Sequence, residues 1–451
     1  MESASPPPLP PGPRGYPLIG ALPSFIKAPL EFIRDVTRDY GDIVRMGAMG
    51  SRQVFLITRA SHVQHVLQEN NRNYIKGDNF KEIRLIIGDG LPVTEGEDWR
   101  RHRRLLQPAF HRQKIREIVG AMASVVGGVR DRWAALPAGA ALNISSEMMK
   151  LTQRVMLKVL LSVETETENE KLMTAWDEVH AFLTDRLFSI VNFPVSLPFP
   201  SHIRFRRAMK TLDGAVNGIL AERRKAGDGP GDLLSLLLAA RDDATGTGMN
   251  DQELRDEVMT MFVGGFETTA VVLAWAWLLL GRHPEVREKL VAEVDSVLKG
   301  RTPTSEDLPR LRYTKMVIDE TMRLYPSAWT FTRTNLEADT IGGFSIPKGS
   351  VLFVCAYATH RDEEVWPNPE AFDPERFAEA GVNRPRYAFY PFGGGPRQCI
   401  GEAFAMAEMQ IVLAMMTQRF LLLPEPGLSV EPEPLFTLRS KPAITMLVNA
   451  R

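Results

Sequence analysis

The sequence predicts a mainly α-helical protein with a small β-rich part. From about Glu97 to Leu324 the hydrophobic residues recur with a period near 3.6, which is typical of helices that bury one face. Stretches that alternate like strands occur before this region and return after it. The chain has 451 residues, of which 44% are hydrophobic and 24% charged, a composition that supports a large folded core. Length alone favours two or three domains, with one large fold as the alternative.

The predicted elements follow one another in a simple order. The alternating stretch "DIVRMGAMGSRQVFLI" predicts an early pair of strands, and loops at "AGDGPGD" and "DDATGTGM" interrupt the helical region. Strands are expected again in "DTIGGFSIPKGSVLFVCAYA". A proline-studded aromatic stretch comes next, "VWPNPEAFDPERF", followed by a cysteine loop, one more helix and a β-like tail.

Composition and targeting features exclude several classes of protein. The net charge of −1 indicates no particular partner, and two cysteines cannot form a disulfide framework, which favours a reducing compartment. The proline-rich start, about residues 1–20, lacks a long apolar segment and predicts neither a signal peptide nor a membrane anchor. The strongest apolar run, Ala270–Leu280, is too short to span a bilayer. Without a P-loop or a well-placed GxGxxG the sequence indicates no nucleotide site, and we expect a cytoplasmic protein.

The stretch "FGGGPRQCIG" places one of the two cysteines in an unusual setting. Cys399 stands just before a helical run, whose N-terminal N–H groups and partial positive charge would stabilise a thiolate. The three glycines would let a flat ligand approach the backbone, and Arg397 would pair with a carboxylate on that ligand. Together these features suit a metalloporphyrin that carries propionates.

Two other interpretations of Cys399 stay open on the residues alone. A buried structural cysteine after a glycine turn is the more common case. A nucleophilic cysteine would need a base, and no His or Asn partner is apparent nearby in the sequence. The other cysteine, Cys355 in "VLFVCAYA", is expected to be a small apolar residue in a buried strand.

A second motif lies in "YTKMVIDETMRLYP", where Glu320 and Arg323 stand one turn apart on a predicted helix that Pro326 ends. Because apolar residues share their stripe, the pair is expected to be buried and to need a further partner. Arg376, in "DPERF", is the candidate. The alternative is an exposed pair that contributes only about 0.2–0.5 kcal/mol.

A long helix is predicted to begin after Asn250, which forms a capping box with Glu253, and to stop at Gly281. Gly264 in its middle, like the glycine that follows it, costs about 1 kcal/mol relative to alanine. Either close helix packing or room for a ligand would explain these glycines. In the second case the adjacent acid and hydroxyl, Glu267 and Thr268, suit a proton relay.

The basic stretch "EDWRRHRRLLQPAFHRQKIR" carries Trp99 and Arg103 one helical turn apart. An indole N–H and a guanidinium in this arrangement are able to hold an anion. A solvated basic face is the alternative, and it is our preferred account of Arg100, Arg101 and Arg104. Nucleic-acid binding is disfavoured, because the net charge is near zero and no binding motif accompanies the helix.

Taken together, these stretches closely resemble the motifs of the cytochromes P-450, the haem-thiolate monooxygenases. The family pattern F-x-x-G-x-R-x-C-x-G is matched by Phe392, Gly395, Arg397, Cys399 and Gly401. The E-x-x-R pair, the meander arginine, the oxygen-binding helix motif and W-x-x-x-R are matched in family order, by Glu320 with Arg323, Arg376, "GGFETT" and Trp99 with Arg103. Arg333, in "FTRTN", falls where the family often has another propionate-binding arginine.

The resemblance implies a fold and a cofactor. It implies a single cytochrome P-450 haem domain over residues 1–451, with a β-rich lobe and no fused reductase. Cys399 would be the axial thiolate of the iron in haem b. Glu267 and Thr268 would deliver protons to bound oxygen, and the structural trio Glu320, Arg323 and Arg376 would shape the cysteine loop. The other cofactor-binding positions would be Trp99, Arg103, Arg333 and Arg397, which hold the propionates, together with Phe392, Gly401 and Gly264.

The implied function is insertion of one oxygen atom of O2 into a lipophilic substrate. Electrons would come from a ferredoxin-type donor with its reductase, and ultimately from NAD(P)H. We expect a soluble bacterial-type monomer without a membrane anchor, and Arg100, Arg101, Arg104 and Arg112 are the basic residues expected to dock an acidic donor. Two other functions stay open: a peroxide-dependent relative, which often lacks the acid and alcohol pair, and a haem sensor or carrier without turnover.

The substrate pocket is expected to be apolar. In the family the substrate lies against the loop before Trp99, the central helix and the turn after Pro326. These regions offer Ile86, Ile87, Leu91, Phe262, Val263, Trp329 and Phe331, and the apolar segment 182–202 is expected to cover the entrance. Such linings bind by excluding water, at about 25 cal/mol per Å² of apolar surface. The expected substrate is a fatty acid, terpenoid, steroid or macrolide-like product. No buried basic residue stands out as a carboxylate anchor, so neutral terpenoids and steroids are favoured slightly over fatty acids.

Overall fold

The computed structural model describes residues 7–16, 20–49, 52–77, 80–162, 166–187, 189, 192–226, 231–378 and 384–451. Parts of the proline-rich start, of the loop 226–232 and of the entrance segment 182–202 lie outside these ranges. The chain divides into two compact units that alternate along the sequence. The first comprises Met1–Phe80, Met322–Phe372 and Glu379–Cys399, and the second Lys81–Thr321, Asp373–Ala378 and Ile400–Arg451. The single domain over residues 1–451 stays a prediction.

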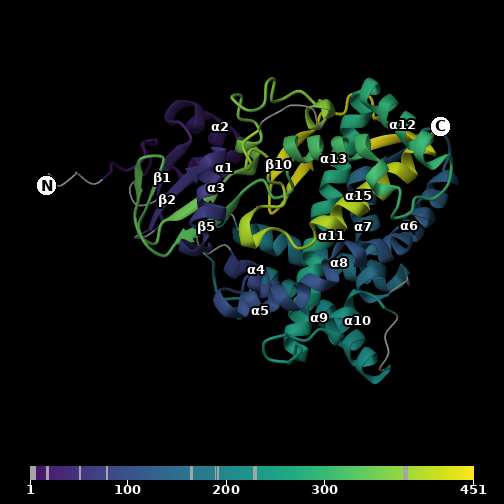
Figure 1. Ribbon diagram of the computed structural model, residues 1–451, viewed down its shortest axis with the longest axis horizontal. Coiled ribbons are helices and arrows are strands. Elements are labelled where there is room, and N and C mark those ends of the chain that lie inside the picture. Colours follow the sequence, from purple (N-terminus) through teal and green to yellow (C-terminus); the bar gives the residue numbers. More distant parts are fainter. Residues whose placement is uncertain are drawn as a thin grey trace. The chain divides into compact units, whose positions relative to one another are not determined.

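The first unit is built on a mixed sheet in the strand order β1-β2-β8-β5-β3. Strands far apart in the sequence pair in it, since β2 lies parallel to β8 and β5 antiparallel to both β8 and β3. Figure 1 shows this as purple strands beside green ones. Its strands are β1 (Ile43–Met49), β2 (Arg52–Ile57), β3 (Tyr74–Lys76), β5 (Phe331–Asn335) and β8 (Val351–Val354). Residues Val54 to Ile57 of β2 are 0% exposed, as expected for an apolar strand covered on both faces.

Short helices and one hairpin complete the first unit. The hairpin joins β6 to β7 in antiparallel register. The elements are α1 (Leu22–Lys27), α2 (Pro29–Tyr40), α3 (Ala60–Gln64), η1 (His65–Glu69), η2 (Asn71–Asn73), β6 (Asp339–Ile341), β7 (Phe344–Ile346), α14 (Ala356–Thr359) and η6 (Gly395–Arg397).

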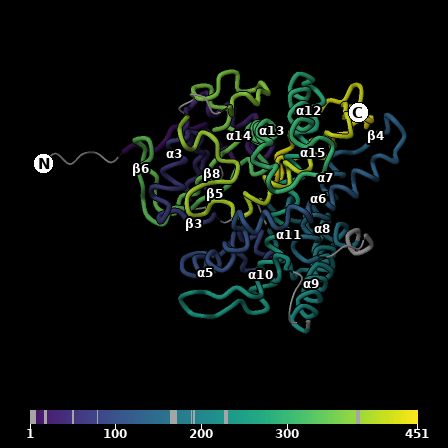
Figure 2. Tube along the Cα trace, turned by 45° about the vertical axis from the view of Figure 1, so that its right-hand side comes forward, coloured from purple at the N-terminus to yellow at the C-terminus, as the bar shows by residue number. Residues whose placement is uncertain are grey.

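The second unit is helical and is organised around α11 (Asp251–Arg282). Every residue from Thr269 to Leu280 is buried, so this part of the helix is apolar all round. The other helices are α4 (Phe80–Ile87), α5 (Gly96–Leu106), η3 (Gln107–Phe110), α6 (Arg112–Ala134), α7 (Ile144–Leu161), α8 (Glu166–Leu187), α9 (Pro200–Ala226), α10 (Leu233–Ala239), α12 (Pro284–Leu298), η4 (Leu308–Arg310), α13 (Arg312–Leu324), η5 (Pro374–Phe377) and α15 (Glu402–Thr417). Helix α11 packs most extensively against α7, and α8 against α9, which lie side by side in Figure 2.

The C-terminal strands belong to the same unit and reach back to α11. Strand β12 lies between β4 and β9, antiparallel to both, and β10 pairs with β11. Their bounds are β4 (Ala140–Asn143), β9 (Phe420–Pro424), β10 (Glu431–Pro434), β11 (Leu438–Lys441) and β12 (Thr445–Ala450). Trp275 of α11 donates its indole N–H to the carbonyl of Leu438 at 2.9 Å, which ties the helix to β11.

Among the described residues, α11 is the one helix long and apolar enough to cross a membrane by length and composition. The apolar window of this helix is 83% buried inside the protein. Its burial identifies α11 as a core helix, because the surface that lipid would cover is already covered by protein.

The predicted order of elements is confirmed, with one correction on α11. The early strands, the later strands, the helix after the cysteine loop and the β tail are present, and the capping box of Asn250 and Glu253 forms. The stop at Gly281 is wrong, since the helix continues to Arg282 and Pro284 opens the next one. A Cβ on Gly281 would lie 2.7 Å from the Cε of Met446, so this glycine allows close packing.

Candidate functional site

The cysteine loop belongs to the first unit and is shaped by its glycines. Gly395 has φ +64, and a Cβ there would lie 1.8 Å from the carbonyl oxygen of Leu67. A Cβ on Gly394 would lie 2.3 Å from the ring of Tyr387. These two glycines are therefore required by contacts within the protein. Gly393, with φ +70 and no atom within 4 Å of its Cβ position, is the one of the three that leaves space open.

The two cysteines differ in their surroundings. Cys355 is fully buried at the end of β8, where burial raises the pKa of its thiol to about 12. This agrees with the structural role predicted for it. Cys399 is exposed, and its backbone N–H donates to the carbonyl of Phe392 at 2.9 Å, which closes the loop. Helix α15 begins at Glu402, so the loop delivers Cys399 just ahead of a helix N-terminus.

The predicted arginines of the first unit lie on different elements. Arg397 is half-buried in the short turn η6, and Phe392, earlier in the same loop, is also half-buried. Arg333 is 6% exposed on β5, donates to the carbonyl of Thr332 at 2.9 Å and lies 4.9 Å from the ring of Phe331. A buried guanidinium retains its charge, so Arg333 is a fixed cation.

Arg323 organises the meander of the first unit. It is 0% exposed and donates to the carbonyls of His360, Pro369 and Ala371 at 2.7 to 3.0 Å. Its guanidinium also lies 5.3 Å from the ring of Trp366. The predicted burial of this arginine is confirmed, and no local sequence pattern reveals these three backbone partners.

Glu320 meets its predicted partner within the second unit. The carboxylate is 0% exposed and lies 3.4 Å from the Nε of Arg376. It also accepts the backbone N–H of Asp373 at 2.9 Å. The prediction that Arg376 would complete the motif is confirmed. The alternative, in which Glu320 and Arg323 form a solvent-exposed pair on α13, is excluded because both residues are buried.

Helix α11 carries an open stretch on one face. Gly264 is exposed and has no atom within 4 Å of its Cβ position, and Thr268, one turn later, is half-buried. The hydroxyl of Thr268 donates to the carbonyl of Gly264 at 2.8 Å. A hydroxyl bonded in this way to the preceding turn weakens the local helix ladder. The two residues therefore offer bare backbone and one hydroxyl on the same face.

The side chain of Glu267 lies in a different environment from the open face that carries Gly264 and Thr268. The carboxylate is 0% exposed and accepts from the hydroxyl of Thr437 at 2.7 Å, while Nε2 of His180 lies 3.0 Å away and a guanidinium nitrogen of Arg439 2.9 Å away. Burial alone would raise the pKa of Glu267, but the close approach of His180 and the charge of Arg439 lower it to about 2. Glu267 is therefore an anion at neutral pH.

Sequence reasoning missed the three partners of Glu267. His180 lies on α8, Thr437 just before β11 and Arg439 within it. No local motif connects these positions. The available signal was general: a carboxylate in an apolar helix stripe needs cations or donors from other elements.

Helix α5 presents Trp99 and Arg103 as predicted, one turn apart and both half-buried. Arg103 donates to the side chain of Gln107 at 3.2 Å. The residue between them on the buried side, His102, lies 2.7 Å from the carboxylate of Glu257 on α11. This contact attaches α5 to α11 on the side of His102.

The solvated basic face predicted for α5 is only partly correct. Arg100 is exposed and pairs with the nearby Glu97. Arg101 instead donates to Glu253 at 2.6 Å and to the carbonyl of Gly248, and Arg104 donates to Asp242 at 2.8 Å. Arg101 thus attaches α5 to the first turn of α11, and both arginines attach it to the segment before that helix.

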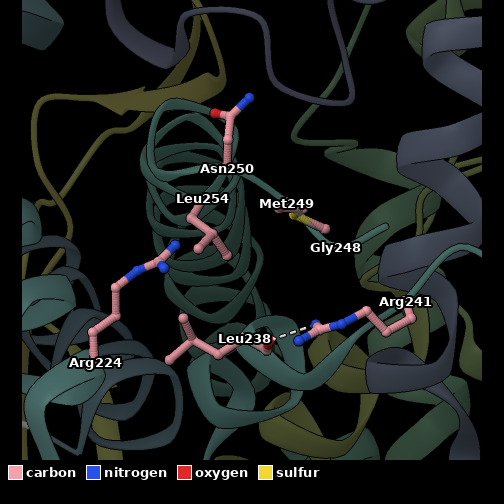
Figure 3. Close-up of a pocket in the computed structure, with 7 residues that line it drawn as sticks. All are labelled: Arg224, Leu238, Arg241, Gly248, Met249, Asn250 and Leu254. Atoms are coloured by element: carbon pink, nitrogen blue, oxygen red, sulfur yellow. Dashed lines mark hydrogen bonds between the residues drawn. The ribbon is translucent and has the colours of Figure 1, made fainter. Parts of the chain in front are cut away.

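A pocket of about 330 Å³ lies at the N-terminal end of α11, and none of the predicted site residues lines it. Arg224 and Arg241 enter it from opposite sides in Figure 3. Arg224 pairs with Asp251, and Arg241 donates to the carbonyls of Leu238 and Ala240. Both cations are satisfied by the protein itself, so the cavity has no evident catalytic chemistry.

Comparison with known proteins identifies what the chain is similar to. The family model described as "Cytochrome P450" matches residues 10–447. Cyclooctatin synthase of Streptomyces melanosporofaciens is 37% identical over 434 residues, which cover 95% of this chain and 93% of that protein. Cyclooctat-9-en-7-ol 5-monooxygenase of the same organism is 36% identical, covering 94% and 93%. Pentalenene oxygenase of Streptomyces avermitilis is 32% identical, covering 97% of each chain.

Proposed function

Because the chain belongs to the cytochrome P450 family, and is thus a haem b monooxygenase with a cysteine axial ligand, we propose that Cys399 supplies the thiolate. The observation that carries this proposal is the contrast between the only two cysteines. Cys355 is fully buried with a raised thiol pKa, whereas Cys399 is exposed at the end of a glycine loop. Thiolate is the reactive ligand form, so the buried thiol is unsuited to bind iron.

The cofactor-binding positions are proposed from the donors that each unit offers. In the first unit, Arg397 and Arg333 have guanidinium groups suited to propionates, and Phe392 holds the loop through its carbonyl. On α5, Trp99 and Arg103 offer an indole N–H and a guanidinium on one face. Gly264 leaves bare backbone on α11, and Gly401 is the residue from which α15 starts. The donor chemistry of these residues fits a porphyrin with two carboxylates.

When bound, the haem supplies the reductive activation of O2. The protein's proposed part is to manage protons. The hydroxyl of Thr268, held by the carbonyl of Gly264, is positioned to donate a proton on the open face of α11. The proposed part of Glu267 is electrostatic: a carboxylate with a pKa of about 2 stays ionised at neutral pH, so it orients the donors around it, His180 among them, and does not itself take up and pass on protons.

The proposed substrate is a neutral terpenoid. Two relatives are named for cyclooctat-9-en-7-ol and pentalenene, and both names denote carbon-rich molecules without charge. The predicted apolar residues Ile86, Phe262 and Val263 are buried in the second unit. Steroids and fatty acids are the less favoured classes. Binding to such residues relies on apolar area, at about 25 cal/mol per Å².

The proposed electron donor is a ferredoxin with its reductase. Dependence of product formation on this donor and on O2 distinguishes the proposal from its alternatives. A peroxide-dependent enzyme would form product from hydrogen peroxide alone, and a haem sensor or carrier would form none.

The ligand assignment is tested by replacing each cysteine. Reduced wild-type protein with carbon monoxide is expected to show the red-shifted Soret band of thiolate ligation, and Cys399→His is expected to abolish it. Cys355→Ala is the matched control and is expected to keep the band. A Cys399→His protein that retains the band would refute the assignment, as would loss of the band in Cys355→Ala with haem still bound.

A further inference from the structure

We propose that His360 is a positioning residue for the thiolate, because its imidazole holds the start of the cysteine loop by accepting the backbone N–H of Tyr390. The inference rests on the assignment of Cys399 as the iron ligand. His360 follows α14 directly, and Tyr390 stands nine residues before Cys399, all within the first unit. Nε2 of His360 lies 3.0 Å from the backbone nitrogen of Tyr390.

The backbone of His360 is fixed on two sides. Its N–H donates to the carbonyl of Ala356 at 2.9 Å, at the end of α14, and its carbonyl accepts from the guanidinium of Arg323 at 3.0 Å. The residue is 0% exposed, and its ring centre lies 5.1 Å from the ring centres of Phe389 and Tyr390. The imidazole therefore has little room to turn away from the N–H that it accepts.

The surroundings of His360 keep its ring in the form that accepts a hydrogen bond. Burial lowers the pKa of the imidazole, and the charges of Arg323 and Arg361 act in the same direction, so that the pKa falls to about 3. The ring is therefore neutral at pH 7. Because Nε2 accepts, the one ring proton lies on Nδ1. A protonated imidazole would be a donor at both nitrogens and would lose the bond to Tyr390.

Tyr390 connects this anchor to the cysteine. Its carbonyl accepts the backbone N–H of Gly393 at 2.9 Å, which forms the turn that opens the glycine stretch. Its hydroxyl lies 3.0 Å from Oγ1 of Thr359, so the side chain is held from the same segment as its backbone. The carbonyl of Phe392, within this turn, accepts the N–H of Cys399 at 2.9 Å. The position of the turn therefore sets the position of the cysteine.

Removal of the imidazole acceptor is expected to move this turn. Tyr390 is 4% exposed, so its N–H would be left buried without the partner that it has now. A buried backbone N–H without a partner is costly, and the chain shifts until the group finds another acceptor. Because the turn also holds Cys399 through Phe392, the sulfur would be held less firmly.

Three substitutions of His360 separate hydrogen bonding from packing. Glutamine carries an acceptor oxygen at about the same distance along the side chain as Nε2, asparagine carries one only at the distance of Nδ1, and leucine carries none. His360→Gln is expected to retain firm thiolate ligation, whereas His360→Asn and His360→Leu are expected to weaken it. His202→Leu removes another buried imidazole, from α9 in the second unit, and is the matched control.

The measurement uses the haem-loaded full chain, reduced and bound to carbon monoxide, in a urea concentration at which circular dichroism still reports a folded protein. The red-shifted Soret band of thiolate ligation is expected to disappear about tenfold faster in His360→Leu and His360→Asn than in wild type. His360→Gln and His202→Leu are expected to stay close to wild type. Hydrogen exchange of residues 386–399, followed by mass spectrometry, is expected to accelerate in the same two variants that lose the band.

Two results would overturn the role of His360. One is a His360→Leu protein that keeps the band as long as wild type, and the other is a His360→Gln protein that loses it as fast as His360→Leu. Should His360→Leu fail to fold, His360→Asn gives the same comparison. A wild-type protein without the red-shifted band would refute the assignment of Cys399 instead, so the two failures are distinguishable.

Discussion

Thr268 and Glu267 are neighbours in the sequence, yet their side chains belong to different surroundings. Thr268 lies on the open face of α11, bonded to the carbonyl of Gly264. Glu267 is buried and held by side chains from α8 and the C-terminal strands. Because their surroundings differ, the two residues are expected to respond differently to substitution.

Replacing Thr268 by alanine is expected to lower the coupling of electron use to product formation. The variant keeps its haem and its substrate affinity, but it lacks the hydroxyl that donates on the open face. Product formed per NAD(P)H consumed is expected to fall by about tenfold or more, with the missing electrons recovered as hydrogen peroxide.

The next residue provides a control for this experiment. Thr269 is buried, and its hydroxyl donates to the carbonyl of Gly265 at 3.1 Å in the same local geometry. Thr269→Ala is expected to affect stability without affecting coupling. If Thr268→Ala left coupling unchanged, its hydroxyl would have only a packing role.

Glu267 is expected to contribute to stability in a way that depends on pH. Its pKa is about 2 in the folded protein against a usual value of 4.5, so its stabilisation is complete above pH 4.5 and is lost as the pH falls toward 2. At pH 7 the shift corresponds to about 3 kcal/mol. Glu267→Gln is expected to unfold more easily by about that amount at pH 7, and by less at pH 4. Urea unfolding at both values measures the difference.

The exposed Glu288 of α12 supplies the comparison for Glu267. Glu288→Gln is expected to change the unfolding free energy by less than about 0.5 kcal/mol at either pH. A Glu267→Gln variant as stable as Glu288→Gln at pH 7 would show that the ion pairs with His180 and Arg439 do not stabilise the fold.

The sequence predicts which residues of α11 belong to the candidate site, but it does not predict which side chains bind to them. The glycines and the acid stand out locally, because each is unfavourable in an apolar helix unless something compensates for it. Thr437 and Arg439 lie 170 and 172 positions further along the chain than Glu267. Contacts of this range depend on how β11 packs on α11, which no periodicity encodes.

At the scale of elements, glycines explain where sequence patterns succeeded and failed. The caps and periodicity of α11 predicted its start correctly, because the capping box is a local arrangement. The predicted stop at Gly281 is wrong, because this glycine lies within the helix and serves close packing against β9 and β12. The sequence motif likewise predicts the cysteine loop. It does not show that Gly394 is required by its close contact with Tyr387, and Gly395 by its close contact with Leu67.

Gly281→Ala tests the packing interpretation of this helix end. Alanine improves helix propensity by about 1 kcal/mol, but its Cβ would lie 2.9 Å from Pro424 and 3.2 Å from the carbonyl oxygen of Leu422. The backbone oxygen and the proline ring cannot move freely, so net destabilisation of about 1–3 kcal/mol is expected. The free energy of unfolding in denaturant is the measurement.

Gly128 on α6 is the matched position, since it is exposed, helical and has no atom within 4 Å of its Cβ position. Gly128→Ala is expected to stabilise the protein by about 0.5–1 kcal/mol. Equal stabilisation by both substitutions would contradict the close contact at Gly281.

The positive and negative charges of the whole molecule are nearly equal in number. The distribution of charge on the surface therefore decides where a charged partner binds. The chain has a net charge of −1. Of the arginines expected to dock an electron donor, Arg100, Arg101 and Arg104 each pair with a carboxylate of the chain itself. Their charges are therefore largely compensated. Arg112, at the start of α6, is exposed and forms no ion pair with any described residue.

The sequence shows which residues of α5 are positively charged, but it does not show which of them pair with carboxylates of the same chain. Asp242 lies 138 positions from Arg104, and Glu253 lies 152 positions from Arg101. Arg112 and Arg116 of α6 are both exposed and without carboxylate partners among the described residues, which makes them the better candidates for docking. We propose that these two arginines steer an acidic ferredoxin.

Reversal of both charges, in Arg112→Glu with Arg116→Glu, is expected to slow reduction by ferredoxin at low ionic strength by about tenfold or more. The difference from wild type is expected to shrink as salt is added, since the Debye length falls to about 8 Å at physiological ionic strength. Stopped-flow reduction under carbon monoxide measures the rate.

Arg104→Glu is the contrasting variant: it faces the buried Asp242, so it is expected to lower stability through repulsion. Reduction by the folded Arg104→Glu protein should stay closer to wild type than reduction by the double variant. A double variant reduced at the wild-type rate at every salt concentration would exclude this surface, because steering by exposed charge cannot be independent of ionic strength.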